Sequence, residues 1–391
     1  MEHVIFSALS AHLETVNYFP NQQHGFRKGF SCETLLALFI HDVQSNLDSN
    51  VRTDAIFLDF TKAFDTVSHS CLLYKLSLLN LHPHVLAWIE NYLRHRSQAT
   101  MVNITLSSFV PVLSGVQQGS VLGPLFFLND LPSCVSSSIR LFADDCVLYR
   151  SVSSAADSAS LQHDLDAIFS WCSPWFLSLN VSKCAHVSFS RSKLTYSQSY
   201  TLGSSFVPKS NTFKYLGLTL TSNLTWSNHI SSIVTDANRK LGCLRRHLKN
   251  ATPSIKQLAY STLIRPKLEY ACSIRDPHQT NFSNVLESLQ NRAARFISHN
   301  YNFPSSVSLI KSSLSVPNLD LRRKYFRICL FYKFLHDRSL RPPFVVPAFY
   351  ISPRYDHSFK VERLSCHSVQ FSRSFFPHTI TEWNPTCVGV S

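Results

Sequence analysis

Apolar positions in the first half of the chain alternate between helical and strand-like spacing. Repeats of three or four residues predict helices, whereas continuous or alternating apolar runs predict strands. Ser31 is the expected N-cap of one helical run, and Pro20 ends another. The elements predicted here are helices over 1–18, 33–47, 68–80 and 83–95, a buried strand over 54–60, and a β-hairpin over 99–113.

The pattern continues beyond residue 120 with shorter elements. Residues 121–128 are expected to begin a helix with Pro124 in its first turn. A longer helix is predicted over 157–175, and a pair of strands around 184–190 and 213–220. One face of the longer helix carries four apolar side chains, Leu161, Leu165, Ile168 and Phe169. Ser-rich stretches at 151–160 and 188–205 are interpreted as loops.

The C-terminal part of the chain has a different pattern of charged and apolar residues. Residues 229–300 follow a helical and basic pattern that suggests a separate helical domain, with Arg239 and Arg245 among its cations. In the last ninety residues, prolines and scattered aromatic residues indicate mixed structure, from which no function can be deduced.

Candidate chemistry centres on Asp144 and Asp145, an acidic pair between short apolar flanks. Such flanks predict the turn of a β-hairpin, with Asp59 and Asp65 following an earlier buried strand. Adjacent carboxylates repel one another, so holding them near apolar strands favours neutralisation by metal ions. Two alternatives remain open, because acidic pairs are common on solvated turns and Asp59 is also suited to cap a helix.

Composition and charge point to a folded protein with an anionic partner. The 391 residues, of which 45% are hydrophobic, suffice for two or three domains. Lys and Arg number 37 against 24 Asp and Glu, which gives a net charge of +13. This excess favours nucleic acid as a partner, although a generally basic surface is the alternative.

Cysteine usage and the lack of long apolar runs indicate in which cellular compartment the protein is expected. The 11 cysteines form no CxxC pair, which argues against a zinc module and against a disulfide scaffold. No segment has the pattern of a signal peptide or the length of a membrane span. We therefore expect an intracellular, reducing location and no membrane partner, with nucleus and cytoplasm both open.

Six segments, taken in order, resemble the reverse transcriptases of non-long-terminal-repeat (LINE-type) retrotransposons, particularly the jockey-like branch. They include Phe142-Ala143-Asp144-Asp145, and the resemblance runs nearly from end to end of the chain. The six segments are 21–29, 57–65, 114–124, 142–145, 179–184 and 213–217. Downstream, the segments 266–274, 292–296 and 375–384 also resemble the family, without an assigned chemical role.

The resemblance implies an α+β fold, the right-hand polymerase. Residues 1–222 are expected to form partial fingers and a palm with an antiparallel sheet. Residues 223–300 would be a helical thumb, and residues 301–391 a C-terminal extension of unknown role.

The implied activity is RNA-directed DNA synthesis by two-metal nucleotidyl transfer, with two Mg²⁺ ions or, as an option, Mn²⁺. The implied partners are an RNA template, a DNA primer and deoxynucleoside triphosphates, and the oligomeric state is left open. The alternative is a catalytically inactive, decayed remnant that at most binds nucleic acid. An unrelated two-metal nuclease is a third hypothesis, which Gln118-Gly119 and the primer-grip segment at 213–217 disfavour.

The resemblance also assigns roles to individual residues. Asp59, Asp144 and Asp145 correspond to the catalytic, metal-binding triad, and Lys183 to a lysine that protonates the leaving pyrophosphate. The expected nucleotide-binding residues are Phe60, Phe64, Gln118, Gly119, Arg27 and Lys28, and the expected primer grip is Tyr215, Leu216 and Gly217. For several of them a structural role is the alternative: core packing for Phe64 and a solvated basic turn for Arg27 and Lys28.

Three departures from the family pattern stand out. The chain begins late, so the upstream finger segment and the endonuclease domain of such elements are expected to be missing. The link after Pro124 is about three residues short, which would rotate a continuing helix by roughly 300°. Arg275 replaces the usual Trp, and a guanidinium is expected to fill an apolar contact poorly.

Overall fold

The chain forms two compact units in a computed structural model that describes residues 2–16, 18–94, 96–116, 128–191, 198–302, 305–352 and 356–386. Unit 1 comprises residues 1–35, 52–188 and 193–210, and unit 2 comprises residues 36–51, 189–192 and 211–391. The chain therefore passes between the units several times. The expected domain division at residues 222 and 300 stays a prediction.

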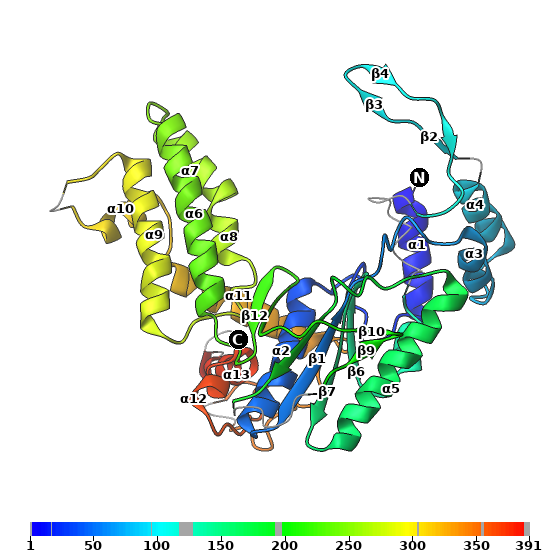
Figure 1. The fold of residues 1–391 in the computed structure, drawn as a ribbon. Helices are drawn as coiled ribbons and strands as arrows, with labels where there is room; N and C mark the ends of the chain where they lie inside the picture. Colours follow the sequence, from blue (N-terminus) through cyan, green and yellow to red (C-terminus); the bar gives the residue numbers. More distant parts are fainter. Residues whose placement is uncertain are drawn as a thin grey trace. The chain divides into compact units, whose positions relative to one another are not determined.

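A four-stranded sheet is the centre of unit 1 (Figure 1). Its strands, in spatial order, are β6 (Ser138–Phe142), β7 (Asp145–Val152), β1 (Arg52–Leu58) and β8 (Ala185–Phe189). Both β6 and β1 pair antiparallel with β7, and Leu58 lies opposite Cys146. All residues of β1 after Arg52 are buried, as the continuous apolar run predicted. The predicted antiparallel sheet is confirmed for these three strands.

Helix α5 (Ala155–Cys172) covers one face of this sheet (Figure 1). Leu161, Leu165 and Ile168 pack with sheet residues such as Ile56 in one apolar cluster. Phe169 was predicted on the same face, but its side chain is 45% exposed.

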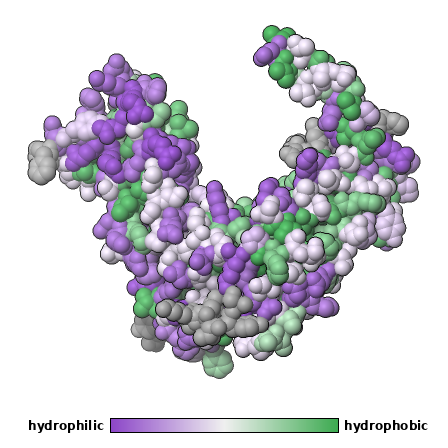
Figure 2. All heavy atoms as spheres, viewed as in Figure 1, coloured by the Kyte–Doolittle hydropathy of each residue, from purple (hydrophilic) through white to green (hydrophobic). Residues whose placement is uncertain are grey.

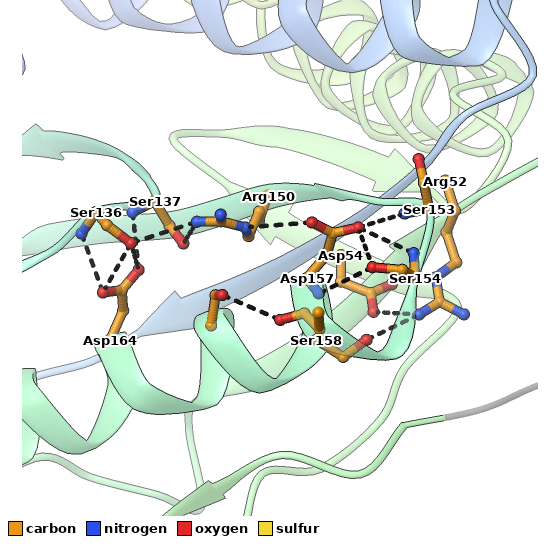
Figure 3. Close-up of polar contacts among 12 residues, drawn as sticks. Arg52, Asp54, Ser136, Ser137, Arg150, Ser153, Ser154, Asp157, Ser158 and Asp164 are labelled. Atoms are coloured by element: carbon orange, nitrogen blue, oxygen red, sulfur yellow. Dashed lines mark hydrogen bonds and ion pairs between the residues drawn. The ribbon is translucent and has the colours of Figure 1, made fainter.

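Polar contacts fix the start and the middle of α5 (Figure 3). Ser154 and Asp157 form a capping box at its start, so the Ser-rich stretch 151–160 is not only a loop. Further along, the carboxylate of Asp164 accepts hydrogen bonds from the backbone N–H groups of Ser136 at 3.0 Å and Ser137 at 2.7 Å. These contacts set the position of α5 beside β6.

The other elements of unit 1 are shorter. Helices α1, α3 and α4 share a second apolar cluster that includes Leu13, Leu76 and Leu93. Among the described residues of unit 1, they are accompanied by two turns of 3₁₀ helix and three small antiparallel strand pairs. The bounds are α1 (Glu2–Thr15), α3 (His69–Ser77), α4 (Pro83–Leu93), η2 (Leu131–Cys134), η3 (Ser173–Trp175), β2 (Ser97–Gln98), β3 (Met101–Val102), β4 (Thr105–Leu106), β5 (Val110–Pro111), β9 (Thr201–Leu202) and β10 (Ser205–Phe206).

The predicted hairpin over 99–113 is confirmed as the ribbon formed by β2 to β5. Figure 2 shows apolar residues along this ribbon, and Ile104 at its tip is 95% exposed. Its two-residue strands are too short to bury a face of their own.

Unit 2 is mainly helical. Its helical core gathers Leu241, Tyr260, Leu289 and Phe296 from three different helices. The elements are most of α2 (Cys32–Asp48), β11 (Thr212–Tyr215), β12 (Leu218–Thr221), α6 (Ser227–His247), α7 (Pro253–Leu263), α8 (Arg265–Glu269), α9 (Thr280–Ser298), α10 (Val307–Ser313), α11 (Leu319–His336), α12 (Val369–Ser372) and α13 (Phe375–Thr386). The predicted helical pattern over 229–300 is thus confirmed.

Two expectations need correction. The strands around 184–190 and 213–220 do not pair with each other, because β8 joins the central sheet while β11 and β12 form their own hairpin. Arg275 is fully buried, and its guanidinium donates hydrogen bonds to the backbone carbonyls of Leu268 at 2.6 Å and Tyr270 at 3.1 Å. The guanidinium therefore binds backbone oxygens instead of filling an apolar contact.

The segment 121–128 and the short link after Pro124 lie outside the described residues, apart from Leu128 at its end. In the part that is described, no helix is long and apolar enough to cross a membrane. The ten cysteines of that part are all free thiols.

Candidate active site

The acidic pair lies at the turn of the hairpin between β6 and β7, as predicted. Phe142 and Asp145 are the last paired residues, so Ala143 and Asp144 make a two-residue turn. Ala143 has a φ of 58°, the left-handed conformation that the first position of a type II′ turn requires. This turn puts Asp144 at the tip and Asp145 at the first position of β7.

A segment near the N-terminus holds the acidic turn in place. The Oε1 atom of Gln23 accepts hydrogen bonds from the backbone N–H groups of Gly25 at 2.8 Å and Ala143 at 3.1 Å. A Cβ atom on Gly25 would lie only 2.3 Å from the backbone nitrogen of Ala143. Gln23 and Gly25 therefore position the turn. Sequence reasoning missed this role, and the glycine in the motif was the one signal of close backbone approach.

Asp59 follows directly after β1, whose last residue, Leu58, pairs with Cys146, the residue after Asp145. Its backbone is fixed by the loop before β8, because its carbonyl accepts a hydrogen bond from Asn180 N–H at 2.8 Å. The same loop carries Lys183, whose Nζ atom lies 3.6 Å from Oδ2 of Asp59. The structure thus brings together Asp59 and Lys183, two residues that the sequence had assigned to catalysis from distant segments.

The negative charges of the three carboxylates act on one another. Removal of water by the surrounding protein, followed by the charges of Asp144 and Asp59, raises the pKa of Asp145 to about 6. Desolvation also raises the pKa of Asp144, with the charge of Asp59 adding to it. The three carboxylates therefore repel one another, and a bound cation would reduce this repulsion.

The donor set fits a divalent cation such as Mg²⁺. Carboxylate oxygens are the ligands that this ion prefers. Oδ2 of Asp59 is shielded from solvent and accepts no hydrogen bond from any residue that the structure describes. Within the same residues, however, no three His, Cys, Asp or Glu side chains lie close enough to hold one ion together. A shared ion therefore requires the carboxylates to draw closer.

The two phenylalanines expected near the nucleotide follow Asp59 in the sequence. Phe60 is buried in the apolar cluster under the sheet, so its side chain has a packing role. Phe64 is only partly buried and touches both apolar clusters of unit 1. Its expected role as a steric gate stays a prediction beside its packing role.

The expectation that Arg27 belongs to a solvated basic turn is wrong. The guanidinium of Arg27 is buried and binds both carboxylate oxygens of Glu14, at 3.1 and 3.0 Å. The guanidinium also lies over the ring of Phe30, 4.1 Å from its centroid. These contacts hold the loop together and leave the guanidinium poorly placed to reach a phosphate. Lys28 next to it is exposed.

The expected primer grip is the turn of the β11–β12 hairpin in unit 2. Leu216 and Gly217 have φ values of 43° and 81°, the signs that a type I′ turn requires at both positions. Tyr215 is buried at the end of β11, and the hydroxyl of Tyr270 donates a hydrogen bond to the carbonyl of Leu216 at 2.7 Å. A primer-binding role stays a prediction, as do the roles of Gln118 and Gly119, which lie outside the described residues.

Carboxylates at the ends of neighbouring strands are suited to hold the divalent ions that assist phosphoryl transfer. Residues 3–220 match the family described as reverse transcriptase (RNA-dependent DNA polymerase), which is more than half of the chain. The chain belongs to this reverse transcriptase family, and members of the family generally use divalent metal ions.

The relatives of the chain are polymerases of mobile elements. It is 29% identical to the RNA-directed DNA polymerase from mobile element jockey of Drosophila melanogaster over 76% of its own length. The probable RNA-directed DNA polymerase from transposon X-element of the same fly is also 29% identical, over the same share. The chain spans 34% of the length of each of these relatives. The expected resemblance to jockey-like retrotransposons is confirmed.

Among solved structures, the chain is similar to telomerase from Candida albicans in complex with a fragment of telomeric RNA. The similarity covers 87% of this chain and 57% of that chain, with 12% identity and a TM-score of 0.35. At this TM-score, the likeness adds no support for a particular fold.

Proposed function

We propose that the chain is the core of an RNA-directed DNA polymerase that extends a DNA primer on an RNA template with deoxynucleoside triphosphates. The observation that carries this proposal is the position of Asp59, Asp144 and Asp145 at the ends of neighbouring strands, where burial and then the charges of Asp144 and Asp59 raise the pKa of Asp145 to about 6. All three lie in the segment that matches the reverse transcriptase family. The relatives named for this activity support the same function.

The right-hand polymerase is the architecture that fits this function. The antiparallel strands β6, β7 and β1 support a palm, since they carry the acidic turn and Asp59 at their ends. The basic helices that follow residue 223 support a thumb, with the β11–β12 hairpin as a primer grip beside it. Basic side chains on such helices would follow the phosphates of a nucleic-acid backbone.

The aspartates have distinct tasks in this proposal. Asp59 and Asp144 would hold the ions, and Asp145 would support them from the first position of β7. Two Mg²⁺ ions, or Mn²⁺ in their place, activate the primer hydroxyl and stabilise the charge on the leaving pyrophosphate when bound. Lys183, whose Nζ atom lies 3.6 Å from Oδ2 of Asp59, would donate a proton to the pyrophosphate.

Other residues of the chain would select and orient the nucleotide. Phe64 would disfavour a ribose 2′-hydroxyl, and Lys28, which is exposed, would contact phosphates. Gln118 and Gly119 would approach the template and the incoming nucleotide. The free thiols of the described cysteines support work in a reducing compartment inside the cell.

Primer extension on poly(rA) with an oligo(dT) primer tests the proposal. The full chain is expected to add dTMP in the presence of Mg²⁺, and Asp144→Asn is expected to abolish the addition. Asp166→Asn, a change at an exposed carboxylate of α5, is the matched control and keeps the activity. No extension by the unchanged chain, or equal extension by Asp144→Asn, would contradict the proposal.

A further inference from the structure

Unit 2 contains a pocket that the proposed function does not use. Its volume is about 280 Å³, near the lower end of small-molecule sites. The loop before α6, the loop before α9 and the segment around α12 line it, together with one residue of α2. Every lining residue belongs to unit 2, whereas the three aspartates belong to unit 1.

Two long helices begin at this pocket. Trp226 and Ser227 are the N-cap and first residue of the 21-residue α6, and Gln279 is the N-cap of the 19-residue α9. Neither N-cap side chain accepts a hydrogen bond from its helix. Helix N-termini present backbone N–H groups and a partial positive charge, which favour anions. Two such ends at one pocket indicate an anion as the ligand.

A buried hydroxyl on the pocket wall is an independent sign of a missing partner. Ser374 is 7% exposed, and its Oγ atom forms no hydrogen bond with any residue that the structure describes. A buried hydroxyl without a partner costs free energy unless a bound group completes it. Ser374 therefore contributes a buried hydroxyl without a hydrogen bond to the lining of this pocket.

The charges around the pocket also suit an anion. The guanidinium of Arg373 is exposed on its wall, where the ring of His278 is exposed as well. The one carboxylate there, Asp276, is already paired with the guanidinium groups of Arg323, at 2.7 Å, and Arg327. The acidic residue therefore does not repel an incoming anion with an uncompensated charge.

Aromatic side chains narrow the class of ligand further. Trp226 and Phe282 line the pocket, and both rings are only partly buried against the helical core. Aromatic faces next to an anion site are the means by which proteins bind bases and phosphates of single-stranded nucleic acid. We propose that this pocket binds a nucleotide, with its phosphate at the two helix N-termini and its base against Trp226 or Phe282.

The nucleotide has two possible sources, a free mononucleotide or one unpaired nucleotide of an RNA strand. Either would be a second binding site outside the residues of the proposed catalytic centre. Its test needs no polymerase activity, and Asp144→Asn is expected to leave the binding unchanged. Failure of this inference can therefore be distinguished from failure of the proposed function.

Isothermal titration of the full chain with adenosine 5′-monophosphate, inorganic phosphate and a six-nucleotide oligo(A) tests the inference. Arg373→Gln and Ser374→Ala are each expected to raise the dissociation constant of the mononucleotide about tenfold. Arg363→Gln, at an exposed arginine that does not line the pocket, is the matched control. Thermal melting of each variant shows whether it is folded.

The titrations also separate the two sources. Oligo(A) that displaces the mononucleotide, with a lower dissociation constant, supports a nucleotide of RNA. A mononucleotide that binds more tightly than oligo(A) supports a free ligand. Inorganic phosphate should bind more weakly than the mononucleotide because it lacks the ring. No binding of the mononucleotide and oligo(A), or equal binding by Arg373→Gln and Ser374→Ala, would overturn the inference.

Discussion

Asp54 and Asp59 lie on the same chain segment but have opposite surroundings. The carboxylate of Asp54 is fully buried and accepts hydrogen bonds from Ser188 and Tyr200, each at 2.7 Å. Burial alone would raise its pKa, but the hydrogen bonds from His186 and Ser188 outweigh that effect and lower it. Asp59 instead keeps a shielded oxygen without a hydrogen bond among the described residues. Asp54, whose oxygens accept hydrogen bonds, is structural. Asp59, whose Oδ2 atom has Lys183 at 3.6 Å but accepts no hydrogen bond, is the ligand candidate.

His41 carries a prediction about pH. Its ring stacks on Phe344, with centroids 3.9 Å apart, and burial lowers its pKa to about 4. Between pH 6.5 and 4 the unfolded chain binds a proton there that the folded chain does not. The stability that the neutral His41 contributes is therefore present above pH 6.5 and is lost as the pH falls towards 4. His229 and His378, whose pKa values are also lowered to about 4, act in the same direction.

Replacement of His41 by phenylalanine tests this dependence. His41→Phe keeps an aromatic ring in the apolar site and removes the titrating group. The loss of unfolding free energy between pH 7 and pH 5 is expected to be about 2 kcal/mol smaller than in the unchanged chain. Urea titrations at the two pH values measure it. The same pH dependence in both proteins would contradict the assignment.

At the scale of elements, the contact between Gly25 and the acidic turn is the one most sensitive to substitution. A methyl group on Gly25 would meet the backbone nitrogen of Ala143 at 2.3 Å, and backbone cannot move aside cheaply. Gly25→Ala is therefore expected to displace Asp144 and to lower the rate of nucleotide addition by about a hundredfold. Single-nucleotide extension measures that rate.

Gly242→Ala is the matched control for this change. A methyl group there would find Arg246 Nη1 as its nearest neighbour, at an ordinary 3.8 Å, in the middle of α6. Its activity is expected to be unchanged, and its stability to rise by about 1 kcal/mol. If Gly25→Ala retains full activity while folded, the acidic turn does not depend on this contact.

Two substitutions in the β11–β12 turn are expected to change the stability of the protein in opposite directions. Gly217→Ala places a methyl group 2.8 Å from Tyr270 Cε1 at a φ of 81° and is expected to cost about 1–3 kcal/mol of stability. Leu216→Asn puts a residue that tolerates left-handed backbone at a φ of 43° and is expected to add up to about 1 kcal/mol. Urea unfolding of both variants measures the difference, and a gain in Gly217→Ala would refute the turn geometry.

At the scale of the whole molecule, local patterns predicted the elements well. The helices over 33–47 and 83–95 correspond to α2 and α4 within one or two residues at each end. The acidic hairpin was recognised because its turn and its apolar flanks are adjacent in sequence. The order of motifs then identified the family, which the match over residues 3–220 confirms.

What the sequence did not reveal depends on contacts that hydrophobic periodicity does not specify. The burial of Arg27 requires Glu14 and Phe30, and the burial of Arg275 requires the backbone of the preceding helix and turn. The pairing of β8 follows from the central sheet and not from its own residues. No local pattern of charge or hydrophobicity contains these contacts.

The rate of single-nucleotide addition on an RNA template tests the central claim most directly, that Asp59 belongs to a polymerase centre with Lys183 beside it. Asp59→Asn is expected to lower the Mg²⁺-dependent rate about a thousandfold or more. Lys183→Gln, which loses only the proton donor, is expected to lower it about ten- to a hundredfold. Full activity of folded Asp59→Asn, or no addition by the unchanged chain, would contradict the account.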